Sequence, residues 1–264
     1  MARSAPTLAD SADRHALYQQ AVNAPASCIA FLRDIYHQVR GRPPRVLRED
    51  FCGTALLATM WAEHSPEHRA VGVDLDPEAL AWARAHNLAA SPARERVELI
   101  LADVLEDIPQ RADIVCALNF SYYLLTTRRR LVTYFKRVRR ALMPGGLFVL
   151  DSLGGTDAMA DFCEERDCGE FTYVWRQTGF NPLDHGSTCT IGFTFPDGSA
   201  LDPAFSYPWR MWTMPEIRDC LVEAGFSRVR IFWEYVDADD NPEYVEVVRE
   251  ENQEIFLTYL VAAP

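Results

Sequence analysis

The sequence predicts an α/β fold with a doubly wound, mostly parallel sheet and an inserted antiparallel β segment. Short, continuously apolar runs alternate with helical stretches of about 10 to 15 residues, which is typical of parallel strands buried on both faces. Several of these runs end in an acidic residue. The 264 residues are 48% hydrophobic and 24% charged, which is ordinary for a folded chain. We therefore expect one main core with an appendage.

The first part of the chain predicts helices and then a regular alternation of strand and helix. Residues 12–39 have apolar side chains at helical spacing, interrupted by Pro25, and predict two short amphipathic helices. The break at 41–44 ends the second helix, and a strand begins at 45–47. Further strands are expected at residues 70–76, 97–104, 112–120 and 145–153, and helices at 77–89 and 127–142.

The rhythm changes after Asp151. Residues 171–212 are rich in aromatic and β-branched side chains, with turn signals between them, and predict antiparallel strands packed over the sheet as a lid. The core resumes with a helix at 214–226 and strands at 228–236 and 254–262. The predicted division is a helical cap at 1–40, a core at 41–152 and 213–264, and a lid at 153–212.

Charge argues against a nucleic-acid partner. Basic residues number 26 and acidic residues 38, so the net charge is 26 − 38 = −12, which repels polyphosphate. The most basic stretch, 126–140, places Leu131, Phe135 and Val138 on one helical face and arginines around the rest. We interpret it as a solvated helix that covers the sheet, in preference to a nucleic-acid patch.

Other sequence features limit the compartment and the cofactors. The seven cysteines contain no Cys-x-x-Cys pair, and no histidine cluster stands near Cys163 and Cys168, so we expect neither a disulfide framework nor a metal site. No apolar run approaches the ~20 residues that cross a bilayer, and the first residues lack a signal-peptide core. We expect a cytoplasmic protein, without a membrane partner, that is a monomer or homodimer.

Three predicted strand ends carry the candidate chemistry, because ligands of open α/β sheets bind at the carboxyl ends of the strands. Glu49 and Asp50 precede a turn containing Gly53, which allows close backbone approach to a ligand. Asp74 lies about 20 residues further on, the spacing of an acid that binds ribose hydroxyls. Asp103 follows the third strand, where a carboxylate can accept from an adenine amine. Helix capping is the alternative role for Asp74 and for Asp103.

These motifs together resemble the class I S-adenosylmethionine-dependent methyltransferases. The resemblance covers residues 45–150 and 213–262 and rests on EDFCGTA, AVGVDLDPEAL, ELILADV, ADIVCALNFSYYL, LMPGGLFVLD and AGFSRVRIF. It implies a seven-stranded Rossmann-like sheet, S-adenosyl-L-methionine as cofactor and S-adenosyl-L-homocysteine as product. The cofactor-binding residues that it implies are Glu49 or Asp50, Gly53, Asp74, Leu75, Asp103, Val104, Asn119 and Phe120.

The first loop departs from the pattern of the family. The family shows an acid, any residue and then Gly-x-Gly-x-Gly, whereas this chain has Phe51 and Ala55 at the first and third glycine positions. Period-2 alternation over so short a strand leaves open whether Glu49 or Asp50 faces the cofactor.

The resemblance implies methyl transfer, an in-line displacement in which alignment and exclusion of water supply most of the catalysis. A hydroxyl acceptor would benefit from a general base. The candidates are His185, in a turn of the insertion where it could instead face solvent, and Tyr122, which could instead be packing. The candidate substrate-binding residues are Tyr18, Tyr123, Trp175, Gln177, Trp209, Arg210 and Trp212.

We therefore expect an enzyme that methylates the O or N atom of a small-molecule acceptor. One alternative is a non-catalytic domain that binds S-adenosylmethionine or a partner. Another is a nicotinamide-dependent oxidoreductase, which the missing glycines disfavour.

Overall fold

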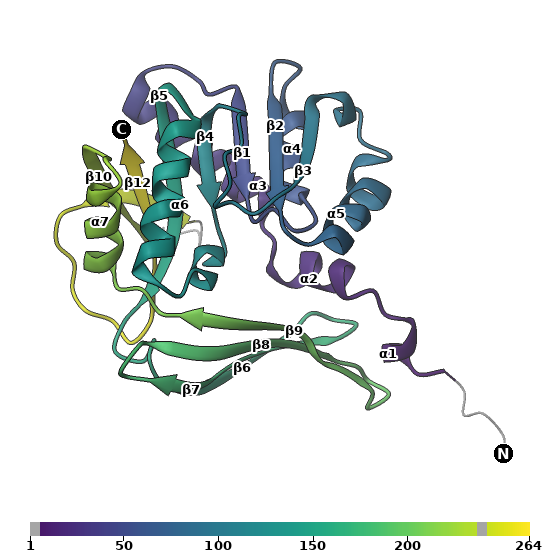
Figure 1. Ribbon diagram of the computed structural model, residues 1–264. Coiled ribbons are helices and arrows are strands. Elements are labelled where there is room, and N and C mark those ends of the chain that lie inside the picture. Colours follow the sequence, from purple (N-terminus) through teal and green to yellow (C-terminus); the bar gives the residue numbers. More distant parts are fainter. Residues whose placement is uncertain (1–5, 237–241) are drawn as a thin grey trace. The chain divides into compact units, whose positions relative to one another are not determined.

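The structure is a computed structural model, and it describes residues 6–236 and 242–264. The chain forms two compact units (Figure 1). The larger unit consists of Ala24–Ala158 and Trp212–Pro264, and the smaller of Met1–Asn23 and Met159–Met211. No helix of the described residues is both long enough and apolar enough to span a membrane.

The larger unit is built on one sheet, which has eight strands in the described residues, in the order β11-β10-β12-β5-β4-β1-β2-β3. The five strands from β5 to β3 are parallel, and β12, β10 and β11 join the other edge antiparallel. This confirms the predicted fold class, but the sheet has one strand more than the seven expected, because β11 was not predicted. The strand bounds are β1 Val46–Asp50, β2 Arg69–Asp74, β3 Val97–Leu101, β4 Ala112–Ala117, β5 Leu142–Gly154, β10 Arg228–Val236, β11 Pro242–Val247 and β12 Phe256–Ala263.

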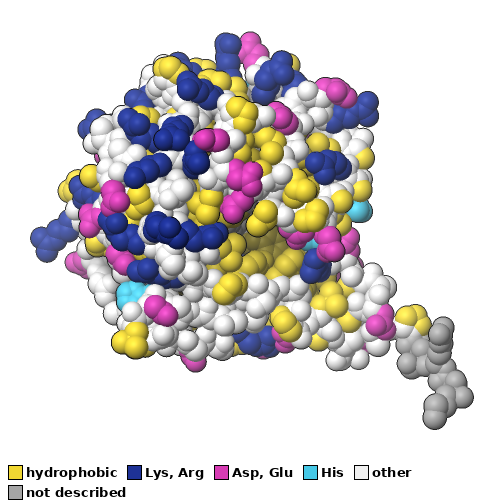
Figure 2. Space-filling view, in the orientation of Figure 1, with side chains coloured by type: hydrophobic (Ala, Val, Ile, Leu, Met, Phe, Trp, Pro, Cys, Tyr) yellow, Lys and Arg dark blue, Asp and Glu magenta, His cyan; other side chains and the backbone are white. Residues whose placement is uncertain are grey.

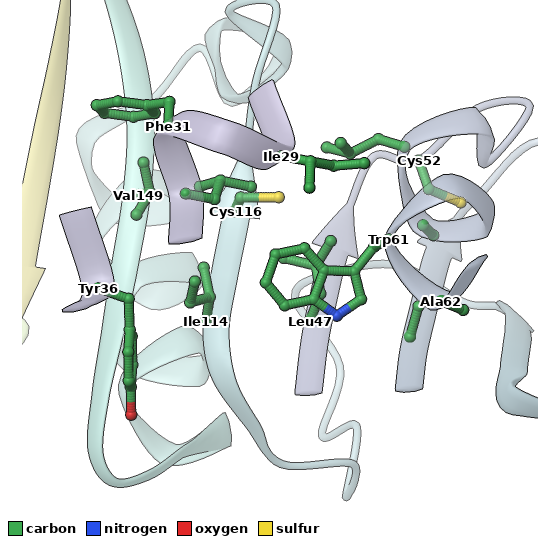
Figure 3. Close-up of a cluster of buried hydrophobic side chains, with 14 of the residues drawn as sticks. Ile29, Phe31, Tyr36, Leu47, Cys52, Trp61, Ala62, Ile114, Cys116 and Val149 are labelled. Atoms are coloured by element: carbon green, nitrogen blue, oxygen red, sulfur yellow. The ribbon is translucent and has the colours of Figure 1, made fainter. Parts of the chain in front are cut away.

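Helices cover both faces of this sheet. Successive side chains of β5 point to opposite faces of the sheet. Leu147 and Val149 join a core that α3, α4 and α5 cover, whereas Phe148 packs against Phe135 of α6. Figure 3 shows the first of these layers, with Trp61 of α4 beside Leu47 of β1. The helix bounds are α3 Pro25–Arg40, α4 Leu56–His64, α5 Pro77–Ala83, α6 Arg128–Ala141 and α7 Met214–Glu223.

Helix α3 belongs with the larger unit, which differs from the predicted cap at 1–40. Pro25 occupies the first helical turn, where its missing N–H costs nothing, and Gly41 ends the helix with a φ of 69°. Leu32 and Tyr36 of this helix are fully buried in the core. The interruption predicted at Pro25 is therefore the boundary between the two units.

The smaller unit is an antiparallel sheet in the order β6-β7-β8-β9, together with α1 and α2. Leu17 and Tyr18 of α2 pack against a cluster that contains Phe171 and Phe193. The predicted turn at 196–198 joins β8 to β9, whereas the charged strand β6 was not predicted. The bounds are α1 Leu8–Ser11, α2 Arg14–Val22, β6 Phe162–Asp167, β7 Thr172–Asn181, β8 Gly186–Thr194 and β9 Ala200–Arg210.

Candidate functional site

The carboxyl ends of β1 to β4 meet at one edge of the larger sheet because these strands are adjacent and parallel. The chain order reverses between β1 and β4, and a ligand of an open α/β sheet binds at such a switch point. The predicted acids lie here: Glu49 on β1, Asp74 at the end of β2 and Asp103 just after β3. The fold therefore gathers at one edge the side chains that the sequence singled out.

Glu49 and Asp50, which the sequence could not separate, have different environments. Asp50 is 1% exposed, and its two oxygens accept hydrogen bonds from Arg48 Nε at 2.7 Å and the Tyr134 hydroxyl at 3.0 Å. Because Asp50 is buried among these partners, its geometry does not favour a direct contact with the cofactor, and its predicted role stays a prediction. Glu49 is the carboxylate of the pair that remains available at the sheet edge.

Glu49 is partly exposed, and one of its oxygens accepts a hydrogen bond from Ala58 N of α4 at 3.0 Å. Burial raises its pKa to about 8, with smaller contributions from Asp74 and Asp50, and the bond from Ala58 opposes the rise. A cationic ligand group would favour the ionised form. Glu49 is therefore suited to pair with an ammonium group.

The loop after β1 keeps the backbone that glycines favour. Phe51, Gly53 and Ala55, at the three positions where the family has glycine, have φ values of 58°, 52° and 52°. The left-handed conformation costs a residue with a side chain about 1 to 2 kcal/mol. The Phe51 ring packs edge-on against Tyr134, with ring centroids 5.6 Å apart, and this contact offsets part of that cost.

Asp74 and Asp76 divide two roles between them. Asp76 accepts hydrogen bonds from Glu78 N and Ala79 N and so caps α5. Asp74 instead accepts from Gly53 N at 2.6 Å and from Asp76 N at 2.9 Å, one bond to each oxygen. A carboxylate has about four acceptor sites, so it retains two for the hydroxyls of a ribose.

Two large apolar side chains are exposed beside these acids. Leu75 is 66% exposed and Leu101, which ends β3, is 56% exposed. A flat adenine ring would cover such side chains, so they fit an adenosyl group better than a solvated strand end. Leu75 was predicted from the sequence and Leu101 was not, although its place in the third predicted strand, just before Asp103, was the available signal.

Asp103 lies in a turn and caps no helix. One of its oxygens accepts from Leu105 N at 2.9 Å, and the other is 4.0 Å from Arg130 Nη2. The neighbouring Val104 is 4% exposed and therefore packs inward. A half-buried carboxylate with acceptor capacity beside Leu101 suits an adenine amine.

The turn after β4 is held by a residue that the sequence analysis did not single out. Asn119 and Phe120 have φ values of 57° and 55°, and their backbone N–H groups donate to the two oxygens of Asp151 at 2.6 and 2.9 Å. Asp151 is 5% exposed, and burial raises its pKa to about 7 against the lowering effect of these two bonds. An acid near the end of a buried parallel strand was the available signal.

The two tyrosines that follow are packing residues in this structure. The Tyr122 hydroxyl donates to the backbone oxygen of Asp151 at 2.7 Å, and the Tyr123 hydroxyl donates to Leu153 O at 3.3 Å. Both side chains are fully buried, and burial raises the pKa of Tyr122 well above its usual range and that of Tyr123 to about 12. This geometry disfavours Tyr122 as a general base.

The other predicted residues are distributed over both units. Cross-strand pairing places Trp175, Gln177 and Trp209 on one face of the smaller sheet, and alternation places Arg210 on the other face. His185 ends the hairpin turn between β7 and β8 with a φ of 60°. Tyr18 lies on α2 with its ring edge-on to Phe205, and Trp212 lies before α7, fully buried. Their roles stay predictions.

Residues 51–146 match the family described as "Methyltransferase domain". This domain spans the loop after β1 and the ends of β2, β3 and β4. This match supports the methyltransferase recognition that the sequence predicts for these residues.

Solved structures share the fold. An S-adenosylmethionine-dependent methyltransferase from Clostridium acetobutylicum ATCC 824 has a TM-score of 0.68 and 19% identity, covering 94% of this chain and 97% of that one. CalS10, an amino pentose methyltransferase from Micromonospora echinaspora with S-adenosylmethionine bound, has a TM-score of 0.66 and 18% identity, covering 94% and 95%. The sugar N-methyltransferase KedS8 from Streptoalloteichus sp. ATCC 53650 has a TM-score of 0.64 and 18% identity, covering 100% and 99%.

A curated relative matches a short segment. The tRNA1(Val) (adenine(37)-N6)-methyltransferase of Porphyromonas gingivalis is 43% identical over 54 residues, which are 20% of this chain and 21% of that protein. The chain thus spans about a fifth of the length of the curated relatives that it matches. The residues at the sheet edge fit S-adenosylmethionine, which the CalS10 structure contains, by charge, acceptor capacity and exposed apolar surface.

Proposed function

We propose that this protein transfers a methyl group from S-adenosylmethionine to the amine nitrogen of a small, polar, sugar-like acceptor. One observation carries the proposal: Glu49, Asp74 and Asp103, which accept hydrogen bonds, follow three adjacent parallel strands beside a loop of left-handed residues. Glu49 would pair with the ammonium of the cofactor, Asp74 with the ribose, and Asp103 with the adenine amine. The bound cofactor supplies a sulfonium methyl group that a nucleophile can displace.

The residues at the sheet edge act by alignment. The acceptor nitrogen uses its lone pair to form the bond to the methyl carbon, while the carbon–sulfur bond breaks and its electron pair stays on sulfur. The methylated nitrogen then releases a proton to solvent. An amine that arrives neutral needs no strong base. The engaged hydroxyls of Tyr122 and Tyr123 support an amine over a hydroxyl acceptor.

The aromatic side of the smaller sheet supports a sugar-like or cationic acceptor. Trp175, Tyr207 and Trp209 form a row of rings, with centroids 5.2 Å apart between the two tryptophans and 5.7 Å between Tyr207 and Trp209. Such faces attract ammonium groups. The neighbours CalS10 and KedS8 act on sugars, which favours testing amino sugars first.

The test is an acceptor panel in which each amino sugar is paired with the parent sugar that has a hydroxyl at the same carbon. We expect mass spectrometry to detect the gain of one CH2 unit on an amino sugar, with stoichiometric S-adenosylhomocysteine. Methylation of only the hydroxyl partner, or of a transfer RNA, would contradict the acceptor assignment. Quenching or enhancement of the fluorescence of a reduced nicotinamide cofactor would favour the oxidoreductase alternative.

A further inference from the structure

Asp151 closes the turn that follows β4. Each of its carboxylate oxygens accepts one backbone hydrogen bond, from Asn119 N at 2.6 Å and from Phe120 N at 2.9 Å. Both donors have left-handed φ values, a conformation that side-chain-bearing residues rarely adopt. Two such residues in succession need a group that holds them, and the Asp151 carboxylate is positioned to do so.

Asp151 is not placed to bind a ligand directly. It is 5% exposed, so the acceptor sites that its two backbone hydrogen bonds leave open are closed off by burial. Asn119, in contrast, is exposed at the carboxyl end of β4, next to the switch point where a ligand of this fold binds. Any effect of Asp151 on the reaction therefore passes through the conformation of the turn.

We propose that Asp151 is a positioning residue for methyl transfer: its ionised carboxylate holds Asn119 and Phe120 in the left-handed conformation that aligns the acceptor. Protonation or removal of the carboxylate releases the turn. The proposal rests on the proposed function, and it concerns the alignment of the acceptor in addition to the cofactor contacts that the resemblance implies for Asn119 and Phe120.

The surroundings of Asp151 make its own titration distinguishable from that of its neighbours. The groups with which it interacts are Cys28 of α3, Cys116 of β4, Tyr122 and Tyr123 of the turn, and Tyr259 of β12. Burial raises the pKa of each of these groups above its usual value, so all are neutral near pH 7. Burial raises the pKa of Asp151 to about 7, so its carboxylate gains a proton as the pH falls through that value.

The proton then weakens the hydrogen bonds that hold the turn, because a protonated oxygen has less acceptor capacity for a backbone N–H group. The same proton has the opposite effect on folding stability. A carboxyl with a raised pKa binds its proton more readily in the folded state than in the unfolded state, so its contribution to stability decreases as the pH rises toward 7. If Asp151 is a positioning residue, activity rises with pH over the range in which the contribution of Asp151 to folding stability falls. If its role is purely structural, activity and folding stability change in the same direction with pH.

The first experiment follows the backbone amide protons of Asn119 and Phe120 by NMR in the wild-type protein without ligands, from acidic to alkaline pH. We expect both resonances to shift with one midpoint near pH 7, and the shift to be absent in Asp151→Asn. If Asp151→Asn does not fold, the wild-type titration decides the question alone. Two amides that do not titrate would overturn the proposal.

The second experiment measures kcat at saturating S-adenosylmethionine, a condition that keeps Glu49 ionised beside the cofactor. We expect wild-type kcat to fall below pH 7, and Asp151→Asn to lose at least about tenfold in kcat with a flat profile. The affinity of this variant for S-adenosylmethionine should fall by less than its kcat, because Asn119 and Phe120 are only two of the expected cofactor-binding residues. A folded variant with wild-type kcat and pH profile would overturn the proposal.

Asp113 provides the matched control. It lies near the amino end of β4, the strand that precedes the turn, where one oxygen accepts from Arg45 N at 2.9 Å and from Val46 N at 3.0 Å. Asp113→Asn should lower stability and leave kcat and its pH profile unchanged, and an equal effect of both variants on the profile would overturn the proposal. If the amides titrate but no acceptor is methylated, the proposed function fails while the Asp151 interaction stands.

Discussion

Asp74 and Asp76 stand two residues apart and illustrate how local hydrogen bonding separates binding from capping. Asp76 satisfies the first N–H groups of α5, which leaves Asp74 bound to the loop after β1 through Gly53. The sequence suggested this division because Asp76 immediately precedes the proline that begins the helix. The same two residues therefore form a matched pair for mutation.

Asp74→Ala should weaken S-adenosylmethionine binding by about 1 to 3 kcal/mol, because the ribose loses its acceptor and the Gly53 N–H its partner. Asp76→Ala should cost about 1 kcal/mol of folding stability through the lost cap and leave the affinity unchanged. Calorimetric titration and denaturant unfolding of both variants check this. An affinity that falls equally in both would remove the ribose role from Asp74.

Glu49 gives the cofactor affinity a pH dependence. Because its pKa is raised to about 8 without a ligand, binding of an ammonium group must release the proton at lower pH. The affinity of the wild-type protein should therefore increase as the pH rises toward 8, by at most about tenfold per pH unit. Glu49→Gln should bind more weakly and lose this dependence, and a steep dependence retained in the variant would contradict the pairing.

At the scale of elements, the loop after β1 shows that its backbone conformation does not require the full glycine motif. Glycine is absent at positions 51 and 55, yet both backbones adopt the left-handed conformation. Tertiary contacts compensate: Phe51 packs on Tyr134 of α6, whose hydroxyl also binds Asp50. The side chains therefore depart from the family pattern at positions where the backbone still has the conformation that glycine favours.

Phe51→Ala and Phe51→Gly separate these two contributions. Both variants lose the ring contact with Tyr134, but only glycine relieves the left-handed backbone. Phe51→Gly should therefore be more stable than Phe51→Ala by about 1 kcal/mol in denaturant unfolding. An alanine variant of equal or greater stability would show that the residue is not held at positive φ.

The sequence predicts the parallel strands and their helices because buried strands are continuously apolar and their acids fall at the ends. It does not predict β6 or β11, whose residues are mostly exposed and whose pairing depends on a neighbouring strand. It also cannot place Asp151 against Asn119 and Phe120. Asparagine tolerates the left-handed conformation but phenylalanine does not, so this turn depends on a contact 31 residues away.

At the scale of the whole molecule, the net charge is −12, and acidic residues pair with part of the basic helix α6. Arg128 pairs with Glu223 of α7, and Arg137 and Arg140 pair with Asp107. Figure 2 shows acidic side chains among the basic ones on this part of the surface. These pairs support the interpretation of α6 as a solvated cover of the sheet. The net negative charge of the molecule favours cationic ligands.

The central claim is that an adenosyl group binds across the carboxyl ends of β1, β2 and β3. Calorimetric titration of the folded wild-type protein with S-adenosylmethionine tests it most directly. We predict saturable binding at one site per chain, weakened by Asp74→Ala and unchanged by Asp76→Ala. A folded sample that shows no binding with the cofactor at hundreds of micromolar would contradict the claim.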